Sequence, residues 1–133
     1  MPVELEMILR ILLAIVLGGA IGFQRGKAEK PAGLRDLILI SAGAALFTVV
    51  SIYGFGAGDQ TRVAAGIVTG IGFLGAGVIL RRGEGAGVKG LTTASTIWIT
   101  AGIGMAAGAG LYIIASVTTL MVLIVLLLPR RIK

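Results

Sequence analysis

One short segment of this sequence, GIGFLGAG, has a residue pattern associated with cofactor binding. Gly70, Gly72 and Gly75 spell G-x-G-x-x-G, which in a Rossmann fold holds the pyrophosphate of a dinucleotide at the start of a helix. That fold also requires a preceding strand and an acidic residue about 20 positions further along. Here the last acidic residue of the chain is Glu84, and the glycines lie inside a long uncharged run where burying a phosphate would be costly. We therefore expect packing glycines and no nucleotide or other cofactor.

The remaining residue types exclude most catalytic and metal chemistry. The chain contains no cysteine and no histidine, so it cannot use a thiol nucleophile, an imidazole base or a Cys/His metal site. The long apolar runs carry no charge at their centres, and no carboxylate pair or nucleophile–base pair is evident. The net charge of +6 is divided among short clusters with few aromatic residues, unlike the surfaces that bind nucleic acid. We expect no catalytic residue, no metal site, no enzymatic activity and no nucleic-acid partner.

The composition and the apolar runs predict a membrane protein. Apolar residues make up 56% of the chain and charged residues 14%, whereas soluble domains are about half apolar and a quarter charged. The uncharged stretch 91–128 would be about 57 Å long as one helix, nearly twice the hydrocarbon thickness of a bilayer, so it must turn near AAGAG at 106–110. The predicted fold is all-α, with a single transmembrane domain over residues 1–133. Its bundle of about five transmembrane helices covers residues 5–22, 37–53, 63–80, 91–105 and 111–128.

The distribution of lysine and arginine predicts the orientation of this bundle. If the N-terminus lies outside, ten of the 12 basic residues fall on the inner side, and only Arg10 and Arg62 on the outer side. Cytoplasmic loops carry such an excess of basic residues, so we expect the C-terminus in the cytoplasm. A cleaved signal peptide is the alternative for the first run. However, Glu4 and Glu6 stand where a signal peptide carries basic residues, which favours a retained helix.

Small residues at helical spacing predict close contacts between helices. In lipid, glycine lets two helix backbones approach closely, so that packing replaces the hydrophobic attraction that is lost there. In the third run, small residues form two faces, one with Gly66 and Gly70 and the other with Gly72. We therefore expect this helix at the centre of the bundle, between two close neighbours, and the first run repeats the pattern. The residues predicted to pack helices are Gly18, Gly22, Gly66, Gly70, Gly72, Gly75 and Gly77.

Polar residues near the ends of the runs are the candidates for a functional role. Arg25 and Arg35 lie in the basic segment between the first two runs, where they can set the topology, bind lipid headgroups or form a docking face. Asp59 suits an N-cap of the third helix, and a contact of Asp59 and Arg62 with an ion or a partner is the alternative. The complete set of candidate polar residues is Arg25, Arg35, Asp59, Arg62, Arg81, Thr92, Thr93 and Thr96.

Two further polar patterns lie within the runs themselves. Arg10 follows Glu6 by four residues, which predicts an ion pair within the first helix or a side chain that reaches the membrane interface. Thr92, Thr96 and Thr100 form a polar stripe at helical spacing on the fourth helix. Such hydroxyls bond to their own helix or join it to a neighbour, and a solute path along the stripe is the alternative.

Four ordered motifs together resemble the membrane domain of the MgtC/SapB family. They are GGAIGFQRG, GLRDLILISAGAALF, RVAAGIVTGIGFLGAGVILRRG and VKGLTTASTIWITAGIGMAAGAG, and they cover nearly the whole chain. The resemblance implies a multi-pass protein of the prokaryotic inner membrane with about five helices and, in the longer members, a cytoplasmic C-terminal domain that we expect to be absent here. Two positions depart from the family pattern. Gln24 replaces an acidic residue before Arg25, and Asp36 follows Arg35 where the family usually has threonine.

The resemblance implies a regulator of other membrane proteins, including the F-type ATP synthase, in magnesium limitation or membrane-energy homeostasis. Together with the small-residue faces, it predicts a non-enzymatic protein that acts in the lipid bilayer through helix contacts. These contacts join the chain to another membrane complex or to itself, with a dimer as the expected homo-oligomer. The alternative is a transporter or channel for a small solute or ion that passes along the stripe from Thr92 to Thr100.

Overall fold

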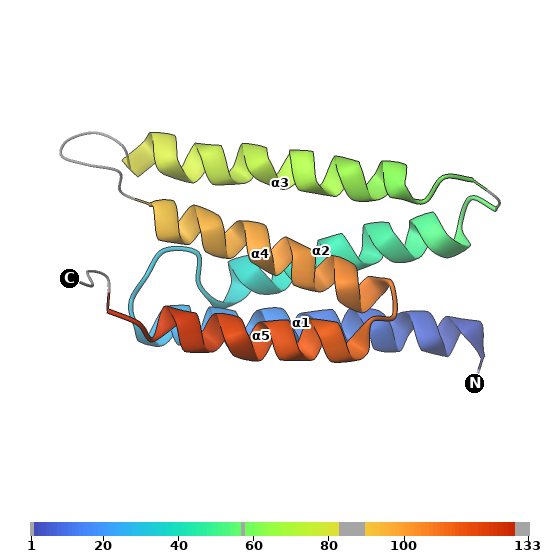
Figure 1. Ribbon diagram of the computed structural model, residues 1–133, viewed down its shortest axis with the longest axis horizontal. Helices are drawn as coiled ribbons and strands as arrows, with labels where there is room; N and C mark the ends of the chain where they lie inside the picture. The colour runs from blue at the N-terminus through green and yellow to red at the C-terminus, as the bar shows by residue number, and fades with distance from the viewer. Residues whose placement is uncertain (1, 57, 83–89, 130–133) are drawn as a thin grey trace.

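Five helices make up the described part of the chain, in the order that the hydropathy predicts (Figure 1). The computed structural model describes residues 2–56, 58–82 and 90–129, apart from the side chains of residues 80–82. The helices are α1 Val3–Lys27, α2 Leu34–Tyr53, α3 Thr61–Arg82, α4 Leu91–Gly108 and α5 Tyr112–Leu126. No strand occurs among the described residues, so the predicted all-α class is confirmed. Three of the helices, α1, α2 and α3, are long and apolar enough to cross a membrane.

The helices run back and forth, so their ends gather at the two ends of an elongated bundle (Figure 1). The N-terminus, the segment between α2 and α3 and the turn between α4 and α5 lie together, and we call this the N-terminal end. The loop between α1 and α2, the end of α3, the start of α4 and the end of α5 lie at the opposite end, which we call the C-terminal end. The positive-inside pattern predicts that the C-terminal end faces the cytoplasm.

Aspartates near the starts of two helices accept hydrogen bonds from free backbone N–H groups. The carboxylate of Asp36 accepts a hydrogen bond from the N–H of Gly33, at 3.3 Å, where α2 begins. Asp59 accepts one from the N–H of Thr61, at 3.0 Å, at the start of α3. The first N–H groups of a helix have no partner within the helix, and a carboxylate there also favours the helix dipole. Asp36, which departs from the family pattern, therefore has a local structural role.

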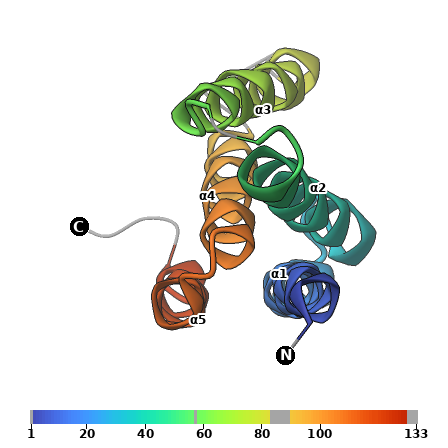
Figure 2. The same ribbon diagram turned by 90° about the vertical axis from the view of Figure 1, so that its right-hand side faces the viewer.

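The helix at the centre of the bundle is α4, and the expectation that α3 occupies this place is wrong. Viewed along the bundle, α4 lies beside α2, with α3 on one side of this pair and α1 and α5 on the other (Figure 2). It contacts each of the other four helices, whereas α3 contacts only α4 and, over a small region, α2. The side chains that α4 buries are small, branched or hydroxyl-bearing, such as Ala101, Gly104 and Ala107. Neighbours can therefore approach α4 from several directions.

The tightest contacts join α1, α2 and α4. A Cβ added at Gly22 would lie 2.6 Å from Cα of Leu34, and one added at Gly18 would lie 2.7 Å from the carbonyl oxygen of Leu37. Across the α2–α4 contact, a Cβ added at Gly108 would lie 2.7 Å from the carbonyl oxygen of Ala45. These neighbours are backbone atoms, so a larger side chain cannot be accommodated by a change of rotamer. The three helices form a core held in backbone contact.

The glycines of α3 differ from those of the core. Apart from the adjoining turns of α3 itself, no described atom lies within 4 Å of a Cβ added at Gly66, Gly70, Gly72 or Gly77, and among the glycines of α3 only Gly75 meets a neighbour, Ala94, at 3.6 Å. The prediction that these four glycines pack against helices of the same chain is therefore wrong. Spacing shows that a face allows close approach, but it does not show which helix supplies the partner. In this chain, small residues of α4 occupy the central position instead.

Candidate functional site

Arg25 forms the most deeply buried polar contact at the C-terminal end. It lies in the last turn of α1 and is only 2% exposed. Its Nη2 group donates hydrogen bonds to the carbonyl oxygen of Pro31, at 2.9 Å, and to the hydroxyl of Thr93 in the first turn of α4. Its Nε atom is buried and has no hydrogen-bond partner among the described residues. One guanidinium therefore joins α1, the loop that follows it and α4.

The burial of Arg25 follows from its place on α1. The buried positions of this helix are Ala14, Gly18, Ile21, Gly22 and Arg25, so the arginine continues the small-residue face that packs on α2 and α4. Sequence reasoning grouped Arg25 with the solvated basic residues of the loop. The signal that could have distinguished it is its spacing of seven from Gly18, which puts both on one helix face. Thr93 is 68 positions away along the chain, and no local pattern indicates that pair.

Three threonines of α4, namely Thr93, Thr96 and Thr100, are buried, whereas Thr92 is exposed. Thr96 donates a hydrogen bond to the carbonyl oxygen of Thr92 on its own helix, at 2.7 Å, while Thr93 accepts the bond from Arg25. Thr100 is fully buried, and its hydroxyl, like that of Ser41 on α2, has no partner among the described residues. Thr93 thus joins two helices, Thr96 bonds within its own helix, and no threonine of α4 lines either of the two cavities described below.

A second polar cluster lies at the N-terminal end and is centred on Arg10. Its Nε group donates to Glu6 at 3.0 Å, as the i, i+4 spacing predicts, and Nη1 donates to the carbonyl oxygen of Gly108 at 3.0 Å. The guanidinium also lies over the ring of Tyr53, with 5.3 Å between its Cζ atom and the ring centroid. Tyr112 donates its hydroxyl hydrogen to Glu6. The cluster thereby connects α1, α2, α4 and α5.

Sequence reasoning found the Glu6–Arg10 pair and missed both tyrosines. Tyr53 and Tyr112 are the only tyrosines of the chain, and each lies next to a predicted turn on the side of the membrane assigned to Arg10. That shared location was the available signal. No sequence signal indicates the contact with the carbonyl of Gly108, because every residue has a backbone carbonyl that can accept a hydrogen bond.

The other candidate polar residues lie apart from both clusters. Arg35, Asp59 and Arg62 are exposed, and the hydrogen bonds that Asp59 accepts from the Thr61 hydroxyl and backbone N–H hold the pKa of its carboxyl below the usual range. Arg81 belongs to the last turn of α3, and its side chain lies outside the described residues. Among the residues that the structure describes, no group of three acidic side chains is arranged to hold a metal ion.

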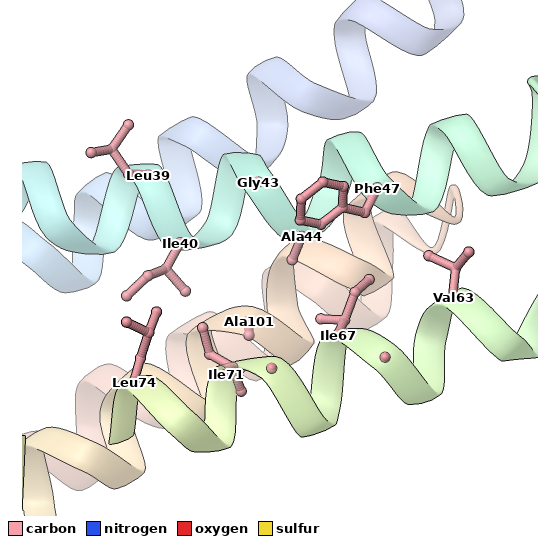
Figure 3. A pocket seen from close by; sticks show the side chains of 12 residues that line it. Leu39, Ile40, Gly43, Ala44, Phe47, Val63, Ile67, Ile71, Leu74 and Ala101 are labelled. Atoms are coloured by element: carbon pink, nitrogen blue, oxygen red, sulfur yellow. The ribbon is translucent and has the colours of Figure 1, made fainter. Parts of the chain in front are cut away.

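An apolar cavity of about 540 Å³ opens between α2 and α3, with α4 as its floor (Figure 3). The side chains of Ile40 on α2 and Leu74 on α3 point toward one another across it. A smaller cavity of about 280 Å³ shares Val63 with it, continues toward the N-terminal end and includes more polar side chains. The residues lining the larger cavity are Leu39, Ile40, Gly43, Ala44, Phe47, Val63, Gly66, Ile67, Gly70, Ile71, Leu74 and Ala101.

Known proteins resemble this chain over most of its length. The model of the MgtC family matches residues 11–133. The Escherichia coli K12 protein named "Putative magnesium transporter YhiD" is 49% identical over 129 residues, which cover 89% of this chain and 59% of YhiD. The Brucella abortus (strain 2308) protein named "Protein MgtC" is 49% identical over 117 residues, which cover 88% of this chain and 48% of that protein.

The matched region is only part of these relatives, because the chain spans about half to three-fifths of their length. No solved structure matches the chain. The family match extends over four of the five helices in full and most of α1, and it agrees with the apolar helices of a membrane protein. The chain belongs to the MgtC family.

Proposed function

We propose that this chain is a non-enzymatic regulator that acts by docking its α3 helix against a transmembrane helix of another membrane protein. The observation that carries the proposal is the unused small-residue surface of α3. Gly66, Gly70, Gly72 and Gly77 have no described atom near the space that a Cβ would take. Among the residues of α3 whose exposure the structure describes, only Gly75 is buried. Glycines that no helix of the same chain uses are available to a helix from elsewhere.

The cavity beside α3 supports the same role. Gly66 and Gly70 line it from α3 and Gly43 from α2, and its walls are apolar. A partner helix with a ridge of branched aliphatic side chains can approach the α3 backbone there, and its side chains can enter the hollow between α2 and α3. Binding would then gain van der Waals contacts without moving the α1–α2–α4 core.

The partner and the cellular process form the finer part of the proposal. The simplest partner is a second copy of the chain, giving a dimer, and another membrane complex such as the F-type ATP synthase is the further candidate. The name of the Escherichia coli K12 relative mentions magnesium, and we extend this to a role of the present chain in magnesium homeostasis. We place it in the prokaryotic inner membrane, with its N-terminus outside.

Site-directed photocrosslinking in native membranes tests docking at α3. A photoreactive amino acid at position 70, in place of Gly70, should form a specific crosslink to one partner or to a second copy of the chain. A Gly66→Ile substitution in the same chain should abolish this crosslink. A probe at Ile113, which is 77% exposed on α5, is the matched control and should not form that crosslink. Equal crosslinking from both positions would contradict the proposal.

A transport assay separates this function from the alternative. Purified chain in liposomes should not carry Mg²⁺, measured with an entrapped fluorescent indicator. Reproducible Mg²⁺ flux that a Thr96→Val variant loses would establish transport and overturn the regulatory role.

A further inference from the structure

We propose that Arg25 and the first turn of α4 form a binding site for a phosphate group. The proposal is independent of docking at α3, because it concerns the contact between the start of α4 and α1. Arg25 is a cation with 2% exposure, and the two groups to which it donates hydrogen bonds, the Pro31 carbonyl and the Thr93 hydroxyl, are both neutral. No described carboxylate forms a hydrogen bond or ion pair with it. A buried charge is unfavourable unless an opposite charge compensates it.

The start of α4 offers hydrogen-bond donors at the same place. Its N-cap is Gly90, which provides no side-chain hydrogen bond, and its first turn contains no acidic residue. The N–H groups of Leu91, Thr92 and Thr93 therefore have no partner within the helix, and they carry the positive end of the helix dipole. Such a helix start favours an anion. The bond from Arg25 to Thr93 holds the guanidinium against this turn.

The unpartnered Nε of Arg25 gives the site its specificity for an oxyanion. A guanidinium presents its N–H donors as a planar fork that matches the oxygens of a phosphate. Here Nη2 already donates to two protein oxygens, whereas the N–H of Nε has no acceptor among the described residues. The residue immediately before this arginine is the uncharged Gln24. A bound phosphate would supply the negative charge that the neutral side chain of Gln24 does not.

The surroundings indicate where such a phosphate would come from. At the same end of the bundle, Phe23 and Leu91 are 60% and 53% exposed, and Lys27 lies over the Phe23 ring, with 5.7 Å between Nζ and the centroid. Exposed apolar side chains next to basic ones are typical of the membrane–water interface. A phospholipid headgroup and a free phosphate in the adjoining aqueous phase share the required chemistry, and both are within reach of such a position.

Thermal unfolding in neutral detergent tests the site and separates the two sources. Dioleoylphosphatidylglycerol should raise the melting temperature of the full chain, and dioleoylglycerol, which lacks the phosphate, should not. Inorganic phosphate is titrated in parallel against chloride at equal ionic strength. Saturable stabilisation by the phospholipid alone assigns a headgroup, and stabilisation by inorganic phosphate also or alone assigns a soluble phosphate. No stabilisation by either probe would overturn the proposal.

Two variants with the same change in net charge locate the site. Arg25→Gln should weaken the apparent affinity for the stabilising probe about tenfold or more, as expected for a lost hydrogen bond to a charged group. Arg35→Gln removes an exposed arginine and should leave the affinity within about twofold. Equal losses in the two variants would indicate general attraction to basic residues and contradict a site at Arg25. If Arg25→Gln does not fold, Arg25→Lys replaces it, since lysine keeps the charge but loses the fork and should still weaken binding.

Discussion

Substituting alanine at two glycines of one chain should change stability in opposite directions. At Gly22, an added Cβ would lie 2.6 Å from Cα of Leu34 and 3.0 Å from the carbonyl oxygen of Gly33. Ordinary van der Waals contact begins near 3.4 Å, so α1 and the start of α2 must part by about 0.8 Å. At Gly72, no described atom lies within 4 Å of the added Cβ, so alanine meets no obstacle there.

The magnitudes follow from two opposing terms. Alanine is favoured over glycine within a helix by about 1 kcal/mol, and this gain applies to both positions. Overpacking of a tight contact costs about 1–3 kcal/mol, and it applies only to Gly22, where backbone atoms block relaxation. We expect Gly72→Ala to be about 1 kcal/mol more stable than the unmodified chain, and Gly22→Ala to be less stable than Gly72→Ala by about 1–3 kcal/mol.

Reversible unfolding of the purified variants in one detergent measures this difference. Gly72→Leu serves as a further control, because the open space at this position should also accept the larger side chain without loss of stability in the isolated chain. The reasoning would be refuted if Gly22→Ala unfolded like Gly72→Ala. It would also be refuted if either Gly72 variant were as unstable as Gly22→Ala.

Three further predictions concern the polar clusters, the start of α3 and the topology. Arg10→Met should lower the free energy of unfolding by about 1–2 kcal/mol, because it leaves a helix carbonyl without its donor, while Tyr112→Phe should lower it less, as denaturant titrations can show. The pKa of the Asp59 carboxyl is lowered in the folded chain, so its stabilisation of the α3 start is complete above the unfolded pKa and lost as the pH falls through the folded value. Amide exchange in the first turn of α3 should therefore lose protection at acidic pH in the unmodified chain, and it should show no such step in Asp59→Ala. Gly58 and Gly26 are both exposed. A cysteine that replaces Gly58 should react with an impermeant thiol reagent from outside, and one that replaces Gly26 should react from the cytoplasm. Reaction of both from one side would contradict the predicted orientation.

The number of helices and their approximate bounds could be predicted because hydropathy is a local signal. Each apolar run had to become a helix, since a backbone in lipid must satisfy its own hydrogen bonds. The run ends were less informative. The first helix continues to Lys27 and the fourth to Gly108, because neither the loss of apolar character nor a single glycine ends a helix.

The order of packing could not be predicted in the same way. Gly18 of α1 and Gly70 of α3 are alike in the sequence, each within a series of small residues, but only Gly18 meets a backbone neighbour. Contact depends on where the partner helix lies, which is a long-range property. The same limit applies to polar residues. Arg10 met its local partner as predicted, whereas Arg25 bonds to Thr93, a residue that no spacing rule relates to it.

The separation of a tight core from a loosely attached α3 helix makes the two proposed sites experimentally independent. Substitutions at Gly18, Gly22 or Gly108 disturb backbone contacts among α1, α2 and α4, so they should reduce stability. Those at Gly18 and Gly22, which share a buried face of α1 with Arg25, should also weaken phosphate binding. Substitutions at Gly66 or Gly70 meet no neighbouring helix of the chain, so a loss of function without a loss of stability must arise from a molecule outside the chain. A loss of function with unchanged unfolding in detergent therefore identifies a binding surface directly. That criterion can be applied before the partner of α3 is known.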